Sequence, residues 1–80
     1  MPTVLRIGPY RFFFYSNEGF EPPHIHVRGA GGDAKFWLEP VEVAYNYGYA
    51  KHELNRIENL VVENVDVLQK AWNEYADRKK

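Results

Sequence analysis

The chain has 80 residues, of which 45% are hydrophobic, 16% aromatic and 26% charged, a composition typical of one globular domain. It contains no cysteine, which excludes disulfide bonds and zinc sites built from thiolates. Ten basic and eleven acidic side chains give a formal charge of −1. The chain therefore lacks the net positive charge that supports sequence-independent binding of nucleic acid, although a local basic patch is compatible with this balance.

No stretch approaches the roughly 18 consecutive apolar residues that would span a membrane. The N-terminal residues 1–6 also lack the long apolar run of a secretory signal peptide. We therefore expect a cytoplasmic protein that has no membrane partner.

The first part of the chain, which holds all five prolines and all six glycines, has the β-branched and aromatic pattern of strands. Five strands are predicted, over residues 3–7, 10–16, 24–28, 34–39 and 41–47. Gly8-Pro9 predicts a turn, and residues 29–33 predict a flexible hairpin loop. Pro40 cannot donate a backbone hydrogen bond, so we expect a bend or bulge between the last two strands.

Residues 51–79 have the periodicity of a helix. The apolar residues that recur every three or four positions are Leu54, Ile57, Val61, Val65, Leu68, Trp72 and Tyr75. One helix of this length would extend about 43 Å, against a radius of gyration near 12 Å for a compact chain of this size. We therefore predict a break near Asn64, a favourable N-cap residue. One long helix that packs against a second copy is the alternative.

Strands followed by helices predict an α+β fold in a single domain, residues 1–80. In this fold an N-terminal antiparallel sheet of about five strands precedes two C-terminal helices that pack on one face of it. Because side chains alternate along a strand, the sheet residues can be assigned to two faces. The face that we expect the helices to cover carries Leu5, Ile7, Phe12, Phe14, Ile25, Val27, Phe36, Leu38, Val43 and Tyr45.

The opposite face mixes basic and aromatic groups. It carries Arg6, Arg11, Phe13, Tyr15, His24, His26, Arg28, Lys35, Trp37 and Glu39. Two helices cover only one face, so we expect Phe13, Tyr15 and Trp37 to be exposed as an interaction surface. The candidate binding residues are Arg11, Phe13, Tyr15, Arg28, Lys35 and Trp37. A protein partner is the main hypothesis. RNA or DNA, whose bases would stack on the rings between cations, and a second copy of the chain in a homodimer are the alternatives.

Pro22-Pro23-His24-Ile25-His26 is the most specific motif. Alternation places both imidazoles on one face of a strand, close enough to share a metal ion or a phosphate. A metal ion would need a third ligand, such as Glu21 or His52. The main hypothesis is structural, with both histidines hydrogen-bonded to neighbouring strands, and we expect no metal ion and no other cofactor.

Catalysis is the alternative role of the same two histidines. In a small ribonuclease-like toxin, His24 and His26 would act as acid and base on RNA, and Arg11, Arg28 or Lys35 would stabilise the developing charge.

Much of the chain resembles a known family. The similar segments are residues 1–6, 10–18, 21–27 with the Pro-Pro-His-Ile-His motif, 34–41, 53–58 and 71–75. Together they are similar to the bacterial domain of unknown function 4160 family, for which no activity is established. The resemblance implies a prokaryotic cytoplasmic protein encoded beside a small protein of the domain of unknown function 2442 family, in an arrangement like a toxin–antitoxin pair. It therefore implies a cognate protein partner and does not say which member is toxic.

Overall fold

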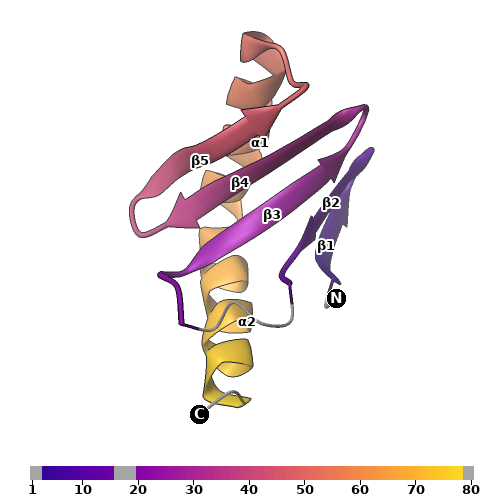
Figure 1. Ribbon diagram of the computed structural model, residues 1–80. Coiled ribbons are helices and arrows are strands. Elements are labelled where there is room, and N and C mark those ends of the chain that lie inside the picture. Colours follow the sequence, from indigo (N-terminus) through magenta and orange to yellow (C-terminus); the bar gives the residue numbers. More distant parts are fainter. Residues whose placement is uncertain (1–2, 16–19, 79–80) are drawn as a thin grey trace.

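Five antiparallel strands and two helices form the fold in a computed structural model, which describes residues 3–15 and 20–78 (Figure 1). The strands are β1 (Thr3–Ile7), β2 (Tyr10–Phe13), β3 (His24–Gly29), β4 (Gly32–Leu38) and β5 (Val41–Tyr47), and the helices are α1 (Lys51–Glu63) and α2 (Val65–Arg78). Neighbours in the sheet are neighbours in the sequence, in the order β1-β2-β3-β4-β5. The α+β fold with a five-stranded sheet and two C-terminal helices is confirmed.

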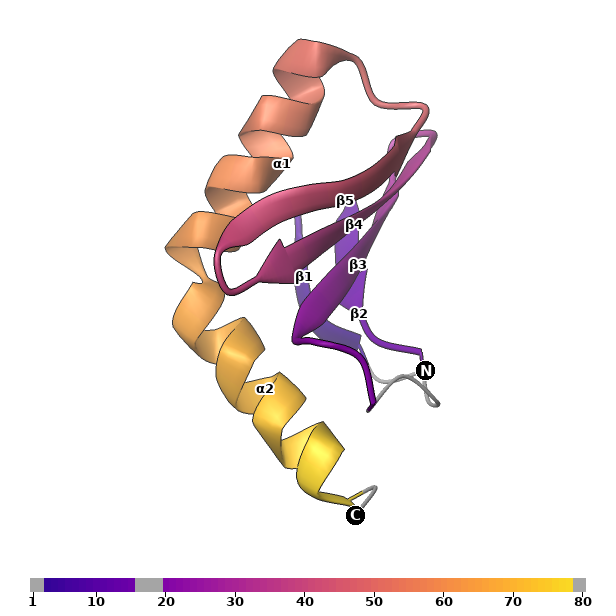
Figure 2. The same ribbon diagram turned by 60° about the vertical axis from the view of Figure 1, so that its left-hand side comes forward.

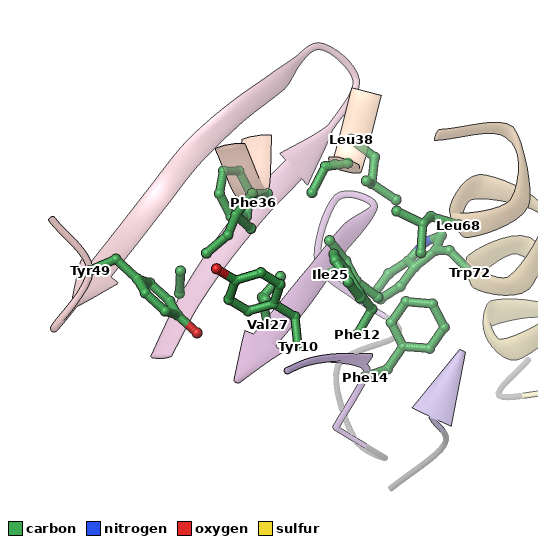
Figure 3. Close-up of a cluster of buried hydrophobic side chains, with 13 residues drawn as sticks. Tyr10, Phe12, Phe14, Ile25, Val27, Phe36, Leu38, Tyr49, Leu68 and Trp72 are labelled. Atoms are coloured by element: carbon green, nitrogen blue, oxygen red, sulfur yellow. The ribbon is translucent and has the colours of Figure 1, made fainter. Parts of the chain in front are cut away.

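The helices cover one face of the sheet, and the core lies between the sheet and the helices (Figures 2 and 3). The buried strand residues on this side include Phe12, Ile25, Val27, Ala34, Phe36 and Leu38, and Phe14 follows directly after β2. Among the helix residues whose burial the structure describes, Ile57, Val61, Leu68 and Trp72 are buried. Alternation along β2, β3 and β4 and the apolar stripe of the helices therefore predicted most of the core correctly.

α1 and α2 follow one another along a single bent rod rather than folding back (Figure 2). The predicted interruption is present at Asn64, whose backbone N–H is shared between the carbonyls of Leu60 and Val61 at 3.1 and 3.2 Å. Its side-chain Nδ2 donates to the Leu60 carbonyl at 2.8 Å, so the side chain caps the end of α1. The N–H of Leu68 bonds to the Asn64 carbonyl at 3.0 Å, which carries the helical hydrogen-bond pattern across the bend.

Several strand limits differ from the prediction. β2 ends at Phe13, short of residue 16, which lies outside the described residues. β3 extends to Gly29 and β4 begins at Gly32, so a tight turn of Ala30 and Gly31 replaces the predicted loop 29–33. Both turn residues have positive φ angles, 55° and 83°, as in the two-residue turns that match the twist of a hairpin.

The predicted bend at Pro40 is present, because a turn at Glu39 and Pro40 separates β4 from β5. A second irregularity lies inside the pairing of these two strands. Lys35 opposes Tyr45 whereas Phe36 opposes Val43, so β5 contains one extra residue and forms a bulge. The extra residue reverses the facing of the side chains that follow it. Tyr45 therefore lies on the face away from the helices, and the prediction that it shares a face with Val43 is wrong.

Tyr49 joins the end of the sheet to the core. It is buried, and its hydroxyl donates a 2.7 Å hydrogen bond to the carbonyl of Gly29. Its ring occupies the space in which a side chain at position 32 would lie, so only Gly32 fits there. Burial raises the pKa of Tyr49 to about 12, from an ordinary value of 10.0.

Stability should therefore fall at alkaline pH. The folded protein favours the neutral phenol of Tyr49, so its contribution is complete below pH 10 and is lost as the pH rises through about 12. Urea unfolding across this window should show a smaller decline for Tyr49→Phe than for the wild type. At neutral pH the same variant should lose about 1 kcal/mol with its hydrogen bond. The matched variant Tyr47→Phe removes an exposed hydroxyl and should change neither quantity.

Candidate functional site

The face of the sheet opposite the helices, here called the open face, carries the candidate binding residues. Directly opposed residues of neighbouring strands share a face, so the pairing defines three rows across it. The first row is Arg6, Arg11, Arg28, Asp33 and Tyr47; the second is Thr3, Phe13, His26, Lys35 and Tyr45; the third is His24, Trp37 and Glu42. Glu39, expected on this face, lies in the turn beyond β4.

Phe13 is the largest departure from the prediction, because its side chain is 0% exposed. The His26 ring stacks on it at 5.5 Å, and the Tyr15 ring meets it edge-on at 5.3 Å. The guanidinium groups of Arg11 and Arg28 lie over the same ring, 4.7 and 5.4 Å from its centre. Neighbours on its own face therefore bury Phe13, and the expectation of an exposed anchor at this position is wrong.

Tyr15 and Trp37, the other two aromatics expected to be exposed, are half-buried. The Tyr15 hydroxyl accepts a hydrogen bond from Arg28 at 2.9 Å. The Trp37 ring lies under the ammonium group of Lys35, with Nζ 4.6 Å from the ring centre. Lys35 also forms a 2.7 Å ion pair with Glu21. Each ring thus shares its surface with a cation, and this arrangement leaves part of each ring accessible.

His24 lies where α2 passes the end of the sheet and is 0% exposed. Its ring is 4.6 Å from Trp72 of α2, 5.2 Å from His26 and 5.8 Å from Trp37. Its Nδ1 lies 2.9 Å from the carbonyl oxygen of Pro22. These contacts favour the structural role, in which His24 joins the helix to the open face.

His26 is buried as well, with the Tyr15 ring edge-on at 4.5 Å. Its Nδ1 lies 3.3 Å from the hydroxyl of Tyr45, which the bulge in β5 has brought to this face. A general acid or base needs contact with its substrate, and burial of both rings leaves RNA no direct access to them. The catalytic role of His24 and His26 stays a prediction.

Metal binding gains no support from the described residues, among which no three histidine or carboxylate side chains converge. Glu21 approaches Nδ1 of His24 only to 3.9 Å, and its carboxylate is engaged by Lys35. His52 is exposed in the first turn of α1.

Arg11 and Arg28, two of the three basic side chains of the first row, are fixed by short contacts. Nε of Arg11 donates to the Thr3 hydroxyl at 2.8 Å, and Arg28 forms a 3.2 Å ion pair with Asp33. The hydrogen bond to Asp33 raises the pKa of Arg28, which is therefore always charged. The row thus joins Arg11 and Arg28, both predicted binding residues, to Arg6, which was assigned to this face but not selected as a binding residue. Register between the strands was the missing signal, because it alone shows that the three arginines are adjacent.

Tyr47 was also missed as a site residue. It is 68% exposed and ends the first row, with its ring 5.1 Å from Tyr45. Its place on the open face follows from the bulge in β5, which the sequence pattern does not reveal.

These features define a small α+β protein with one sheet face packed on helices and the other lined by cations and aromatic rings. Residues 10–73 match the model of the family described as Domain of unknown function (DUF4160), and the chain belongs to this family. No curated protein and no solved structure matches it significantly. Within the described residues, neither helix combines the length and apolar character that crossing a membrane requires.

Proposed function

We propose that this protein is a cytoplasmic interaction module that binds a partner protein on its open face. The partner would be the cognate small protein of the domain of unknown function 2442 family, in a two-gene module of the toxin–antitoxin kind. The observation that carries the proposal is the contrast between the two faces. The helices bury one face, whereas no described helix or strand covers the other, on which Trp37, Tyr15 and Tyr47 keep accessible surface.

The composition of the open face favours a protein partner. Tyrosine, tryptophan and arginine are enriched where interfaces bind most strongly, and all three are present here. Several of the rings are already ordered by contacts with each other, such as the 5.1 Å pair of Tyr45 and Tyr47. Binding would therefore immobilise few additional side chains, which lowers its entropic cost.

Single-stranded nucleic acid is a weaker fit to the same face. Bases stack on open aromatic rings beside cations. The ring enclosed by Arg11 and Arg28 is Phe13, which is wholly buried. The exposed ring of Tyr47 has Asp33, a carboxylate rather than a cation, as its neighbour in the row, so the row does not place the ring directly beside a phosphate-binding group. The chemistry of the face therefore favours protein over RNA.

The proposal is tested by the mass of the protein in solution, alone and mixed with the neighbouring gene product. We expect a 1:1 or 2:2 complex with that product, and calorimetry then gives its affinity. A dimer that forms without the product and excludes it would assign the open face to a second copy. A strict monomer that ignores the product would contradict the proposal.

A further inference from the structure

Three arginines stand directly opposite one another across the first three strands. Arg6 of β1 opposes Arg11 of β2, and Arg11 opposes Arg28 of β3. Directly opposed residues have Cβ atoms roughly 4.5–5.5 Å apart, and like charges at such positions destabilise a sheet. We therefore expect the row to lower the stability of the isolated fold. Such a violation of a local rule is expected where a protein binds something.

The described residues compensate this charge only in part. Asp33 pairs with Arg28 at 3.2 Å. Neither Arg6 nor Arg11 forms an ion pair with any described residue, and Arg11 donates instead to the neutral hydroxyl of Thr3. The row thus carries three guanidinium groups against one carboxylate, although the whole chain has a charge of −1.

Two of the three guanidinium groups, those of Arg11 and Arg28, are also held in place before anything binds. Arg11 and Arg28 both lie over the ring of Phe13, which the stacked ring of His26 fixes in turn. Thr3 and Tyr15 each hold one of these arginines by a hydrogen bond. A planar guanidinium with a fixed orientation is suited to two-point recognition of a carboxylate.

From this geometry we propose that the arginine row of Arg6, Arg11 and Arg28 binds an acidic segment of the partner protein. The inference rests on the proposed function and specifies its chemistry. Three adjacent strands spaced about 4.8 Å apart make the row about 10 Å long. Acidic residues at positions i, i+4 and i+7 of a helix span a similar length, at 1.5 Å per residue. One carboxylate could then meet each arginine.

The test uses a fluorescent oligoglutamate peptide of about 12 residues as the probe, with fluorescence anisotropy as the readout. The wild type should bind it in a salt-dependent manner. Arg6→Gln should weaken binding several-fold, and the double variant Arg6→Gln/Arg11→Gln about tenfold or more, because each substitution removes one cation that pairs with a carboxylate at a solvent-accessible site. The control Lys51→Gln/Lys70→Gln removes the same charge from exposed helix positions and should bind within about twofold of the wild type.

Folding and ligand class are controlled in the same series. Arg6 is exposed, so Arg6→Gln should fold with an unchanged or raised Tm because it relieves repulsion within the row. An oligouridylate of equal charge is the second probe. Equal losses of peptide affinity in the arginine and lysine variants would overturn the proposal. Tighter binding of the oligouridylate than of the peptide would overturn it as well.

Failure of this inference can be distinguished from failure of the proposed function. If the neighbouring gene product binds the arginine double variant as tightly as it binds the wild type, the arginine row is not its contact and the interaction module stands. If the product binds neither the wild type nor the double variant, the proposed function as an interaction module is wrong.

Discussion

Trp72→Ala should lower the free energy of unfolding by about 3–5 kcal/mol, the cost of truncating a buried tryptophan. The side chain is 3% exposed. Its ring meets Phe14 edge-on at 5.3 Å and lies 5.7 Å from Tyr75 and 4.6 Å from His24. A domain of this size is stable by roughly 4–12 kcal/mol in total, so the variant should be largely unfolded at 37 °C.

Urea unfolding followed by circular dichroism measures this loss. Val67→Ala is the matched control, because Val67 is an exposed apolar residue of the same helix and its truncation should cost less than about 0.5 kcal/mol. A midpoint for Trp72→Ala that is no lower than that of Val67→Ala would show that the ring does not anchor α2 to the sheet.

Trp37→Ala, in contrast to Trp72→Ala, should affect binding of the partner more than stability of the fold. Its ring is half-buried and contacts Lys35 and His24 on the open face, so truncation should cost the isolated fold about 1 kcal/mol. We expect it to weaken binding of the partner protein by about 2 kcal/mol or more, because tryptophan is enriched among the few residues that contribute most to binding at interfaces. Thermal unfolding at low protein concentration and calorimetry with the partner measure the two effects on one variant.

Val62→Ala is the control for the interface. Val62 is an exposed apolar residue of α1, and its truncation should change neither stability nor affinity appreciably. If Trp37→Ala instead destabilised the fold as strongly as Trp72→Ala and left the affinity unchanged, Trp37 would be a core residue and the open face would not bind the partner.

Local periodicity in the sequence predicted much of the fold, including most of the buried residues. Alternation placed Phe12, Ile25 and Phe36 on the buried face, and the spacing of three and four residues placed Trp72 on the buried side of the helices. Asn64 marked the interruption between them. These features follow from the sequence because a side chain's direction along one strand or helix depends only on its neighbours in the chain.

Other features depend on contacts between distant segments. Alternation along the strand places Phe13 on the face away from the helices, where we expected it to be exposed. Arg11, His26 and Arg28 nevertheless bury it. Tyr45 reaches the open face because β5 gains one residue against β4, and strand alternation alone does not reveal a bulge.

The candidate site was likewise predicted in part from the sequence and in part required the tertiary structure. The sequence identified basic and aromatic residues that share one face of the sheet, among them Arg11 and Arg28. Only the register of β1, β2 and β3 aligned Arg6 with them in a row, and only the path of α2 placed Trp72 against His24. Facing along a regular strand is a local property of the backbone, whereas bulges, adjacency and burial are set by which strands and helices pack together in the folded chain.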